Sequence, residues 1–373
     1  VCNASHHQAC AREKHTRAFN TGFAHTTIVA DHAWAISKFL GSDAWVGTLK
    51  PRLGLPDHIL ETLPKEEDIV GEAFGFEKQH PELFSGDLIG QLGVYFSYET
   101  RNHTMFGNLA QGYPEDYMQT LSLLFRNGIC AHTVFTFPED AKTYPLILLP
   151  SPLKMTEAEQ VALSKYLEAG GKVLVSGPAA LPDCKRTWTL PNRVSTEAGN
   201  LFITIVNGVS IQRPGWATDT KAEPATEPDA WTEVRPGLYY NPHRLQDAMN
   251  TEKYLTLCKE FARPLPLDVQ AAEGYLVSVF DSGDRYTVQL LAEDYDVDID
   301  HHLDSIRFHR SRVNFITKVL PAGVGTPISI ATRQVPKVYT PFVDGQTKIS
   351  VKDGICTLEL PEDCSYAILD FPK

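Results

Sequence analysis

The chain has 373 residues, enough for two or three domains that each bury a core. Its composition, 43% hydrophobic and 21% charged, is ordinary for a globular protein. No apolar run approaches the roughly 18 residues of a spanning helix, which argues against a membrane protein. The formal net charge of −12 argues against nucleic acid or an anionic membrane as partner, because both attract basic surfaces.

The seven cysteines are scattered along the chain and include no C-x-x-C motif. We therefore expect free thiols in a reducing cytoplasm, with no zinc site and no cofactor. The first residues, Val1 to His7, contain no Met and no apolar core of a signal peptide. We expect a chain that begins within a domain, through truncation, processing or a split gene.

Residues 1–85 have the pattern of a mainly helical segment with too little apolar surface to form a domain alone. Within it, a predicted helix over residues 30–40 places three apolar residues on one face: Ala33, Ile36 and Leu40. Gly41 follows where a left-handed helix cap is expected, and a short helix is predicted near residues 72–78.

The next block alternates strands and helices with short connections. Its predicted strands are apolar on both faces, as in parallel sheets: residues 92–97, 131–135, 146–150 and 172–176. A helix over residues 114–127 carries one apolar stripe, formed by Tyr117, Leu121, Leu124 and Phe125. Thr156 and Glu159 form a capping box that starts a second helix. The alternation predicts right-handed crossovers and a doubly wound, flavodoxin-like α/β sheet.

Beyond residue 181 the pattern is looser. We predict one more strand over residues 201–206, an exposed loop over 217–229 and a helix over 243–261. From Gly274 the period changes to two, which predicts antiparallel strands: 275–280, 285–291, 327–331, 347–351, 355–360 and 366–371. Turn sequences within residues 281–284 and 352–354 predict hairpins, and the whole predicts a small antiparallel β-sandwich.

Several stretches between Leu92 and Gly177 resemble the middle, trimerisation-type domain of family 42 β-galactosidases and related glycosidases. They are Val94–Ser97, Asn127–Ile129, Tyr144–Pro150 and Leu167–Gly177. Residues 360–369 resemble the last sandwich strand of the same enzymes. In that family an N-terminal (β/α)8 barrel carries both catalytic carboxylates, the middle domain has a class I amidotransferase-like fold, and a small β-sandwich closes the chain.

The resemblance implies three parts. Residues 1–85 would be the helical end of the barrel, residues 86–262 the flavodoxin-like domain with a linker helix, and residues 263–373 the sandwich. The catalytic carboxylates would lie outside this chain, since barrel enzymes hold such pairs on the ends of different strands. Glu72 and Glu77 are accordingly interpreted as exposed helix charges.

Working amidotransferases place a Cys at a strained strand-to-helix turn, with a His and an acid that activate it. The corresponding turn of this chain holds Ser176 and Gly177, with no Cys and no indicated His. We interpret the turn as a loop that ends a strand, and keep an amidotransferase-like hydrolase only as an alternative.

The polar stretch 97–104 follows the first parallel strand at the carboxyl edge, where open α/β sheets bind ligands. Glu99, Arg101 and His103 alternate, so we expect them to point into one crevice and to bind sugar hydroxyls. The alternative is a salt-bridged loop locked to a neighbouring domain or subunit.

Aspartates at every second position of the acidic run 293–304 resemble the opening of an EF-hand calcium loop. The loop fails because Ile299 and Ser305 occupy the positions that require Gly and Glu. Three arginines follow and favour structural ion pairing over a metal: Arg307, Arg310 and Arg312. Four tryptophans could stack on sugar rings, although burial is more frequent: Trp45, Trp188, Trp216 and Trp231.

The sequence thus predicts the non-catalytic, oligomerising C-terminal portion of a glycoside hydrolase that acts on β-galactoside-like carbohydrate. Expected partners are carbohydrate and either further copies of the chain, in a trimer, or a separate barrel chain. A free-standing sugar-binding protein that uses the crevice around Glu99 to His103 is the alternative from another class.

Overall fold

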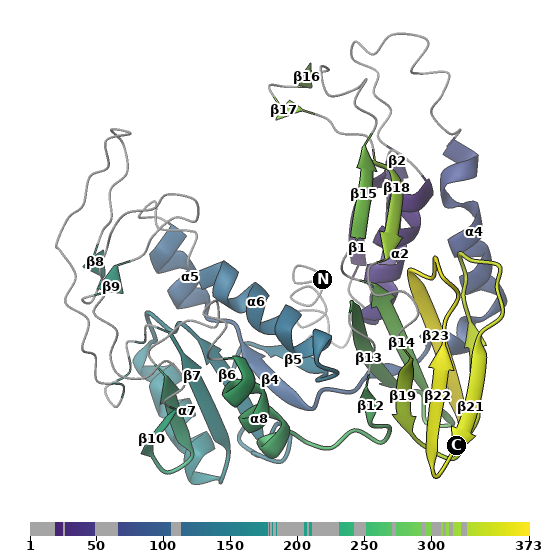
Figure 1. Ribbon diagram of the computed structural model, residues 1–373. Coiled ribbons are helices and arrows are strands. Elements are labelled where there is room, and N and C mark those ends of the chain that lie inside the picture. The colour runs from purple at the N-terminus through teal and green to yellow at the C-terminus, as the bar shows by residue number, and fades with distance from the viewer. Residues whose placement is uncertain are drawn as a thin grey trace. The chain divides into compact units, whose positions relative to one another are not determined.

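The computed structural model divides the chain into two compact units (Figure 1). Unit 1 comprises residues 1–89, 125–130 and 265–373, and unit 2 comprises residues 90–124 and 131–264. The structure describes these residues: 19–24, 27–48, 66–105, 113–177, 179, 181, 184, 205–206, 209–210, 231–241, 251–270, 274–292, 295–299, 307–308, 311–312, 316–321 and 327–373.

Unit 1 begins with alternating strands and helices, whereas the sequence predicts a mainly helical segment. The elements are β1 (Phe19–Ala24), α2 (Thr27–Phe39), β2 (Asp43–Thr48) and α4 (Glu66–Gln79). Strands β1 and β2 are parallel neighbours. The sequence pattern misses them because Asn, Thr and Gly interrupt the apolar runs that indicate buried strands. Gly41, with a φ of 69°, has the left-handed conformation expected of the cap after α2.

Of the three residues predicted on the buried face, only Leu40 is fully buried, and helix α2 buries other residues as well. Ala30, Trp34 and Leu40 are buried, whereas Ala33 and Ile36 are only half-buried. The Trp34 indole contacts three rings edge to face: Phe84, Phe342 and Tyr366. Because Trp34 is the largest side chain of the helix, its burial removes more apolar surface from water than that of Ile36.

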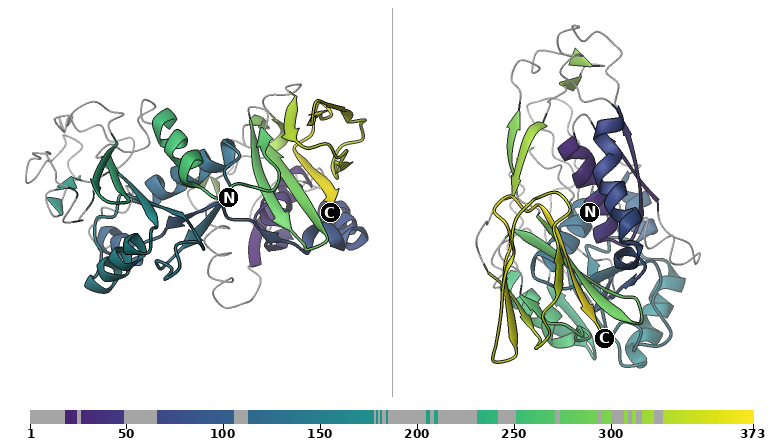
Figure 2. Two further views of the ribbon diagram at one scale, coloured as in Figure 1. Left: turned by 90° about the horizontal axis from the view of Figure 1, so that it is seen from below. Right: turned by 90° about the vertical axis from the view of Figure 1, so that its right-hand side faces the viewer.

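The C-terminal part of unit 1 forms two antiparallel sheets (Figure 2). One sheet contains β3 (Asp87–Leu88), β13 (Tyr275–Asp281), β14 (Arg285–Ala292), β20 (Lys337–Tyr339) and β23 (Tyr366–Pro372). The other contains β12 (Val269–Gln270), β19 (Ile328–Ala331), β21 (Lys348–Lys352) and β22 (Ile355–Glu359). The strand orders are β20-β23-β14-β13-β3 and β12-β19-β22-β21. The six strands predicted after Gly274 are all present.

The two sheets share one hydrophobic core. Inward-facing Val277, Leu290 and Leu369 of the first sheet pack in one cluster with Ile330 and Leu358 of the second. All five side chains are excluded from water. Strands β13, β14 and β23 are buried at consecutive positions, so both faces of the first sheet are covered.

Both predicted hairpins are confirmed. Strands β13 and β14 pair antiparallel across a turn in which Gly283 has a φ of 86°. Strands β21 and β22 pair across Asp353 and Gly354, whose φ values are 54° and 82°. Two consecutive residues with positive φ are what a type I′ turn requires, and Asp-Gly is a favoured pair for it.

Of the acidic run 293–304, which is predicted to be ion-paired, the structure describes only the backbone of residues 295–299. Strand β15 (Tyr295–Ile299) pairs antiparallel with β18 (Ile316–Pro321), and β16 (Arg307–Phe308) pairs with β17 (Ser311–Arg312). The side chains of residues 293–304 and of the three following arginines lie outside the described residues, so their ion pairing stays a prediction. Among the side chains that are described, no group of three or more His, Cys, Asp and Glu is placed to hold a metal ion.

Unit 2 is built on a six-stranded sheet. Its strands are β4 (Leu92–Tyr95), β5 (Ala131–Val134), β6 (Leu146–Pro150), β7 (Lys172–Ser176), β10 (Thr232–Arg235) and β11 (Leu238–Asn241). They lie in the order β10-β11-β7-β6-β4-β5. All neighbours are parallel except β10 and β11, which form an antiparallel hairpin at one edge. The four strands predicted from apolar runs are the parallel strands β4 to β7.

Four helices accompany this sheet: α5 (Tyr98–Met105), α6 (Tyr113–Arg126), α7 (Glu157–Glu168) and α8 (Thr251–Phe261). The predicted stripe of α6 is buried along its whole length. The predicted capping box of α7 is present, with the Glu159 amide donating to Thr156 Oγ1 and the Thr156 amide donating to the Glu159 carboxylate. Residues 243–250 of the predicted last helix lie outside the described part.

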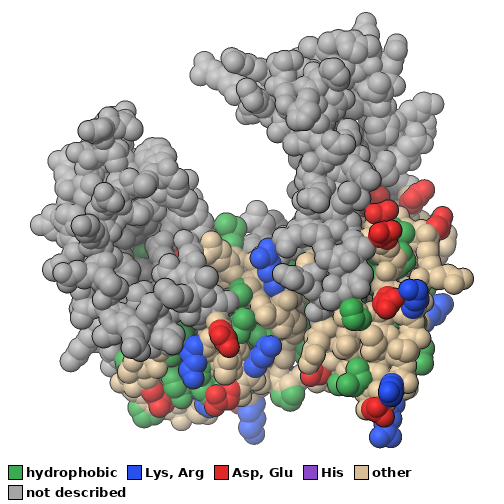
Figure 3. Space-filling view, viewed as in Figure 1, with side chains coloured by type: hydrophobic (Ala, Val, Ile, Leu, Met, Phe, Trp, Pro, Cys, Tyr) green, Lys and Arg blue, Asp and Glu red, His purple; other side chains and the backbone are tan. Residues whose placement is uncertain are grey.

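Of the strand predicted over residues 201–206, the structure describes only β8 (Ile205–Val206), which pairs with β9 (Val209–Ser210). The predicted loop over 217–229 lies outside the described residues. Among the helices that are described, none is long and apolar enough to cross a bilayer. On the described part of the surface that Figure 3 shows, basic and acidic side chains are interspersed.

Candidate functional site

The strand order of unit 2 defines one position where a ligand crevice is expected. The chain forms β4 first, places β5 on one side of it and then places β6 on the other. Where the chain leaves two neighbouring strands in opposite directions, the loops at the carboxyl ends of these strands separate. Ligands of open α/β sheets bind in the gap between such loops. The gap lies between the turn after β4 and the loop after β6.

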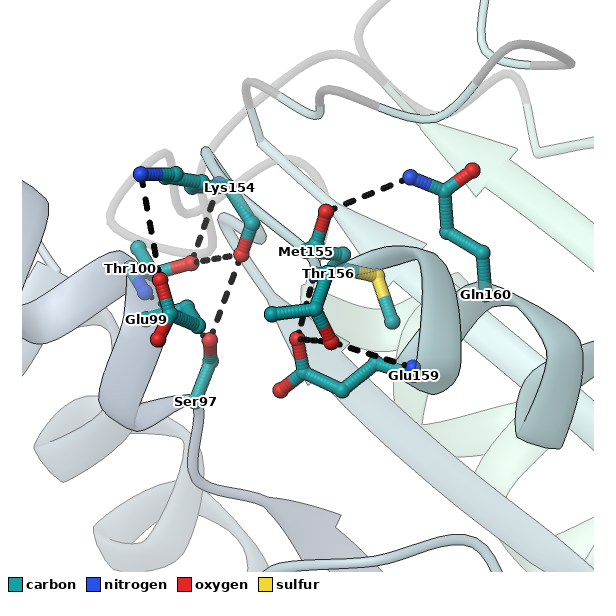
Figure 4. Close-up of polar contacts among 8 residues, drawn as sticks. All are labelled: Ser97, Glu99, Thr100, Lys154, Met155, Thr156, Glu159 and Gln160. Atoms are coloured by element: carbon teal, nitrogen blue, oxygen red, sulfur yellow. Dashed lines mark hydrogen bonds and ion pairs between the residues drawn. The ribbon is translucent and has the colours of Figure 1, made fainter.

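In this protein the two loops are joined directly by hydrogen bonds (Figure 4). Thr100 Oγ1 donates to the carbonyl oxygen of Lys154 at 2.8 Å and accepts from the Lys154 amide at 3.1 Å. Ser97 Oγ donates to the same carbonyl at 3.3 Å and accepts from the Thr100 amide at 2.9 Å. Ser97 and Thr100 are at most 1% exposed. The expected crevice is therefore closed by protein groups at this point.

A second connection ties β4 to the start of α7. Tyr95 donates its hydroxyl hydrogen bond to Glu159, and the other carboxylate oxygen of Glu159 accepts from the Thr156 amide at 2.6 Å. Burial and the hydrogen bond to Glu159 raise the pKa of Tyr95 far above its usual value, so the phenol stays protonated. Glu159 is thus fixed by structural partners and does not face a reacting group.

The strained backbone conformation expected at a catalytic turn occurs at Ser151, directly after β6, and not at Ser176, where the sequence places the candidate turn. The φ of Ser151 is 41°, in a region that few residues other than glycine adopt. Its hydroxyl donates to the buried carboxylate of Asp116, and its amide donates to the Ser176 carbonyl at 2.7 Å. Ser176 itself has no such conformation. Among the described residues no histidine is hydrogen-bonded to either serine, so neither has the base that a nucleophile needs.

The three predicted substrate-binding residues lie on helix α5 and not on the extended loop that their alternation suggested. One residue advances an α-helix by about 100°, so side chains two apart lie on opposite sides. Glu99 lies 3.8 Å from Lys154 Nζ, and both side chains are about half-exposed. The Arg101 guanidinium lies 4.9 Å from the centre of the Tyr98 ring and is hydrogen-bonded to Asn102. The His103 side chain lies outside the described part.

Of the four tryptophans considered for sugar stacking, the side chains of Trp45, Trp188 and Trp216 lie outside the described residues. Trp231 stacks on Tyr254 of α8, with ring centres 5.3 Å apart. Because Tyr254 is 1% exposed, this pair anchors the residue before the edge strand β10 to the interior of unit 2.

In unit 1, Glu77 is not the exposed helix charge that the sequence predicts. Its carboxylate accepts from Trp34 Nε1 at 3.0 Å and from Lys38 Nζ at 2.6 Å. The Lys38 side chain is only 4% exposed. An ammonium group without water needs a close counter-charge, so Glu77 is a structural partner of Lys38. Glu72 is exposed, as predicted.

Asp31 of α2 gives unit 1 a pH dependence near neutrality. Burial, and next the charge of Glu72, raise its pKa from 3.8 to about 7. The protonated Asp31 carboxyl group therefore contributes fully to stability below pH 3.8. This contribution is lost as the pH rises through about 7. We expect Asp31→Asn, which cannot ionise, to lose less stability than the wild type between these values. Denaturant unfolding at a series of pH values measures this, and identical profiles would contradict it.

No family model matches the sequence, and no curated protein matches it either. Solved structures do match. The β-galactosidase from Rahnella sp. R3 has a TM-score of 0.60 and 13% identity, over 100% of this chain and 57% of that one. The α-L-fucosidase isoenzyme 2 from Paenibacillus thiaminolyticus has a TM-score of 0.57 and 13% identity, over 99% and 63%.

Gan42B, a GH42 β-galactosidase from G. stearothermophilus, has a TM-score of 0.52 and 13% identity, over 89% of this chain and 49% of that one. This chain has the fold of part of a GH42-like enzyme. It spans between 49% and 63% of the length of these three structures. At 13% identity the likeness concerns the fold, and it leaves the substrate open.

Proposed function

We propose that this chain is the non-catalytic, oligomerising C-terminal portion of a glycoside hydrolase that acts on β-galactoside-like carbohydrate. The observation that carries the proposal is the closed gap between the loops after β4 and β6. Thr100 and Ser97 occupy the position where an α/β domain of this topology would bind a ligand, and they bind the backbone of Lys154 instead. A domain whose own side chains fill its usual ligand position is suited to hold subunits or other domains of an enzyme together.

The proposal also assigns a fold to each of the three parts of the chain and a location to the protein. The order of the parallel strands, with β4 between β5 and β6, supports a flavodoxin-like, class I amidotransferase-like domain over residues 86–262. Two antiparallel sheets around one core support a β-sandwich over residues 263–373. The parallel pair β1 and β2 with α2 and α4 supports the end of a (β/α)8 barrel over residues 1–85. Five buried cysteines without a disulfide support a cytoplasmic location: Cys130, Cys184, Cys258, Cys356 and Cys364.

The proposal is tested by incubating the purified chain with a chromogenic β-galactoside and following release of the chromophore. We expect no turnover above the buffer rate, because the described residues bring no pair of carboxylates together at a substrate site. Turnover that survives repeated purification and scales with protein concentration would contradict a non-catalytic role. The residues that catalyse this turnover would then lie outside the closed gap.

A second candidate function, a free-standing sugar-binding protein, is favoured by the surface at the start of α5. Tyr98 is 39% exposed there and lies beside the Arg101 guanidinium, and Glu99 and Lys154 are close by. On this proposal the sugar lies across the start of α5, where Glu99 and Arg101, on opposite sides of the helix, contact it together with His103. Isothermal titration with galactose should then show binding that Arg101→Ala abolishes and Lys165→Ala, on α7, leaves intact. Absence of any heat of binding in the wild type would dismiss it.

A further inference from the structure

Two aromatic rings are stacked beside the edge hairpin of the sheet in unit 2. Tyr239 is the second residue of β11, and Phe261 is the last residue of α8. The centres of their rings are 5.2 Å apart, and the ring planes are inclined by 35°. Phe261 is 9% exposed, whereas Tyr239 is only half-buried. The pair therefore presents a flat apolar surface, part of which is open to solvent.

Three charged side chains surround these rings. Lys172 Nζ lies 3.7 Å from the centre of the Phe261 ring. Glu233 lies directly opposite Tyr239 in the β10–β11 pairing and is hydrogen-bonded to its hydroxyl group. Glu260 precedes Phe261 at the end of α8. Burial, then the charge and hydrogen bond of Glu233, and then the charge of Glu260 raise the pKa of Tyr239, so both carboxylates lie close to it.

The protein holds two of these charged groups in place without neutralising them. Glu233 Oε1 accepts from the Gly237 amide at 2.8 Å, within the hairpin turn. Attraction to the face of the Phe261 ring holds the Lys172 ammonium group. Among the described residues, neither Lys172 nor Glu260 belongs to an ion pair. Their donors and acceptors are therefore available to a ligand.

The chemistry of this cluster matches that of a pyranose sugar. Such a sugar has an apolar face of C–H groups, which packs on a flat aromatic surface, and a rim of hydroxyl groups, which both donate and accept. The ammonium group can donate to these hydroxyl groups, and the carboxylates can accept from them. A few fixed polar groups around an aromatic surface are typical of small-molecule sites.

We propose that this cluster is a surface site that binds a pyranose sugar and does not hydrolyse it. The members of the site are Lys172, Glu233, Tyr239, Glu260 and Phe261. The exposed part of the Tyr239 ring packs on the C–H face of the sugar, while Lys172 donates to one hydroxyl group and Glu260 accepts from another. The site goes beyond the proposed function, because it assigns a binding activity to this chain itself.

The first test is saturation-transfer NMR on the full chain with millimolar methyl β-galactopyranoside and, separately, methyl β-glucopyranoside. We expect saturation of the protein to reach the ring C–H protons of at least one sugar, and Tyr239→Ala to remove this transfer. Tyr286→Ala is the matched control, because Lys373 lies over its ring at 4.1 Å but is already paired with Asp281. It should leave the transfer intact.

No transfer from the wild type to either sugar, or equal transfer from the wild type and Tyr239→Ala, would overturn the proposal. Binding that is lost in Arg101→Ala but retained in Tyr239→Ala would place the sugar on α5 and also overturn it. Transfer to the glucoside alone would support the site even if the β-galactoside assignment of the proposed function failed.

A second test does not depend on Tyr239→Ala. Lys172→Met keeps an apolar side chain beside Phe261 but cannot donate a hydrogen bond. We expect the dissociation constant of the bound sugar to rise by about tenfold or more, because a hydrogen bond to a charged group is lost. Lys165→Met, at an exposed position of α7, should leave it unchanged. A dissociation constant that Lys172→Met does not raise would overturn the proposal.

Discussion

Replacing Glu77 by Ala is expected to destabilise unit 1 by about 3 to 5 kcal/mol, because it leaves a buried ammonium group without its counter-charge. Among the described residues, the other carboxylate paired with Lys38 is that of Asp43, which is 3.8 Å away and half-exposed. The Trp34 indole N–H also loses its acceptor. Denaturant unfolding of the purified variant gives the change in the free energy of unfolding.

Lys78→Ala is the matched control, since Lys78 is the next residue of the same helix and is exposed. It should change stability by no more than about 0.5 kcal/mol. The double variant Lys38→Met with Glu77→Met should be less destabilised than Glu77→Ala, because it removes both charges and keeps apolar volume. If Glu77→Ala loses as little free energy of unfolding as Lys78→Ala, the Lys38 ammonium group is not buried in solution.

Replacing Thr100 by Val is expected to destabilise unit 2 by about 1 to 3 kcal/mol. Valine has nearly the same shape but neither donates to the Lys154 carbonyl nor accepts from the Lys154 amide, so that amide is left without its acceptor. Hydrogen exchange at the Lys154 amide should accelerate, and denaturant unfolding measures the loss of stability.

Thr100→Ser keeps the hydroxyl group and is the control for this prediction. It should retain the slow exchange of the Lys154 amide and lose less than about 1 kcal/mol, since it removes only a methyl group. Equal stability of Thr100→Val and the wild type would mean that the two loops are not joined in solution. The gap between them would then be open to a ligand.

The parts of the fold that local sequence determines could be predicted. The strands β4 to β7 are apolar runs bounded by turn residues, and the start of α7 follows from the spacing of Thr156 and Glu159 alone. The hairpin between β21 and β22 follows from Asp353 and Gly354, because few residues adopt positive φ. In each case the deciding interaction joins residues that are close in sequence.

The parts of the structure that depend on residues distant in sequence could not be predicted. Glu77 is bonded to residues 39 and 43 positions away, so its burial leaves no local signal. The bonds between Thr100 and Lys154 span 54 positions and use backbone atoms, which every residue has. Helix α5 has little apolar periodicity, so the sequence pattern does not indicate a helix there. The hairpin of β10 and β11 does leave a local signal, the turn pair Pro236-Gly237.

The measurement that tests the proposed oligomerising role most directly is the molar mass of the purified chain by size-exclusion chromatography with light scattering. A single chain has a mass of 41.5 kDa. The proposal predicts a mass near three times this value, or a stable complex when a barrel chain is added. A mass of one chain at all concentrations, with no complex formed with a barrel chain, would contradict it.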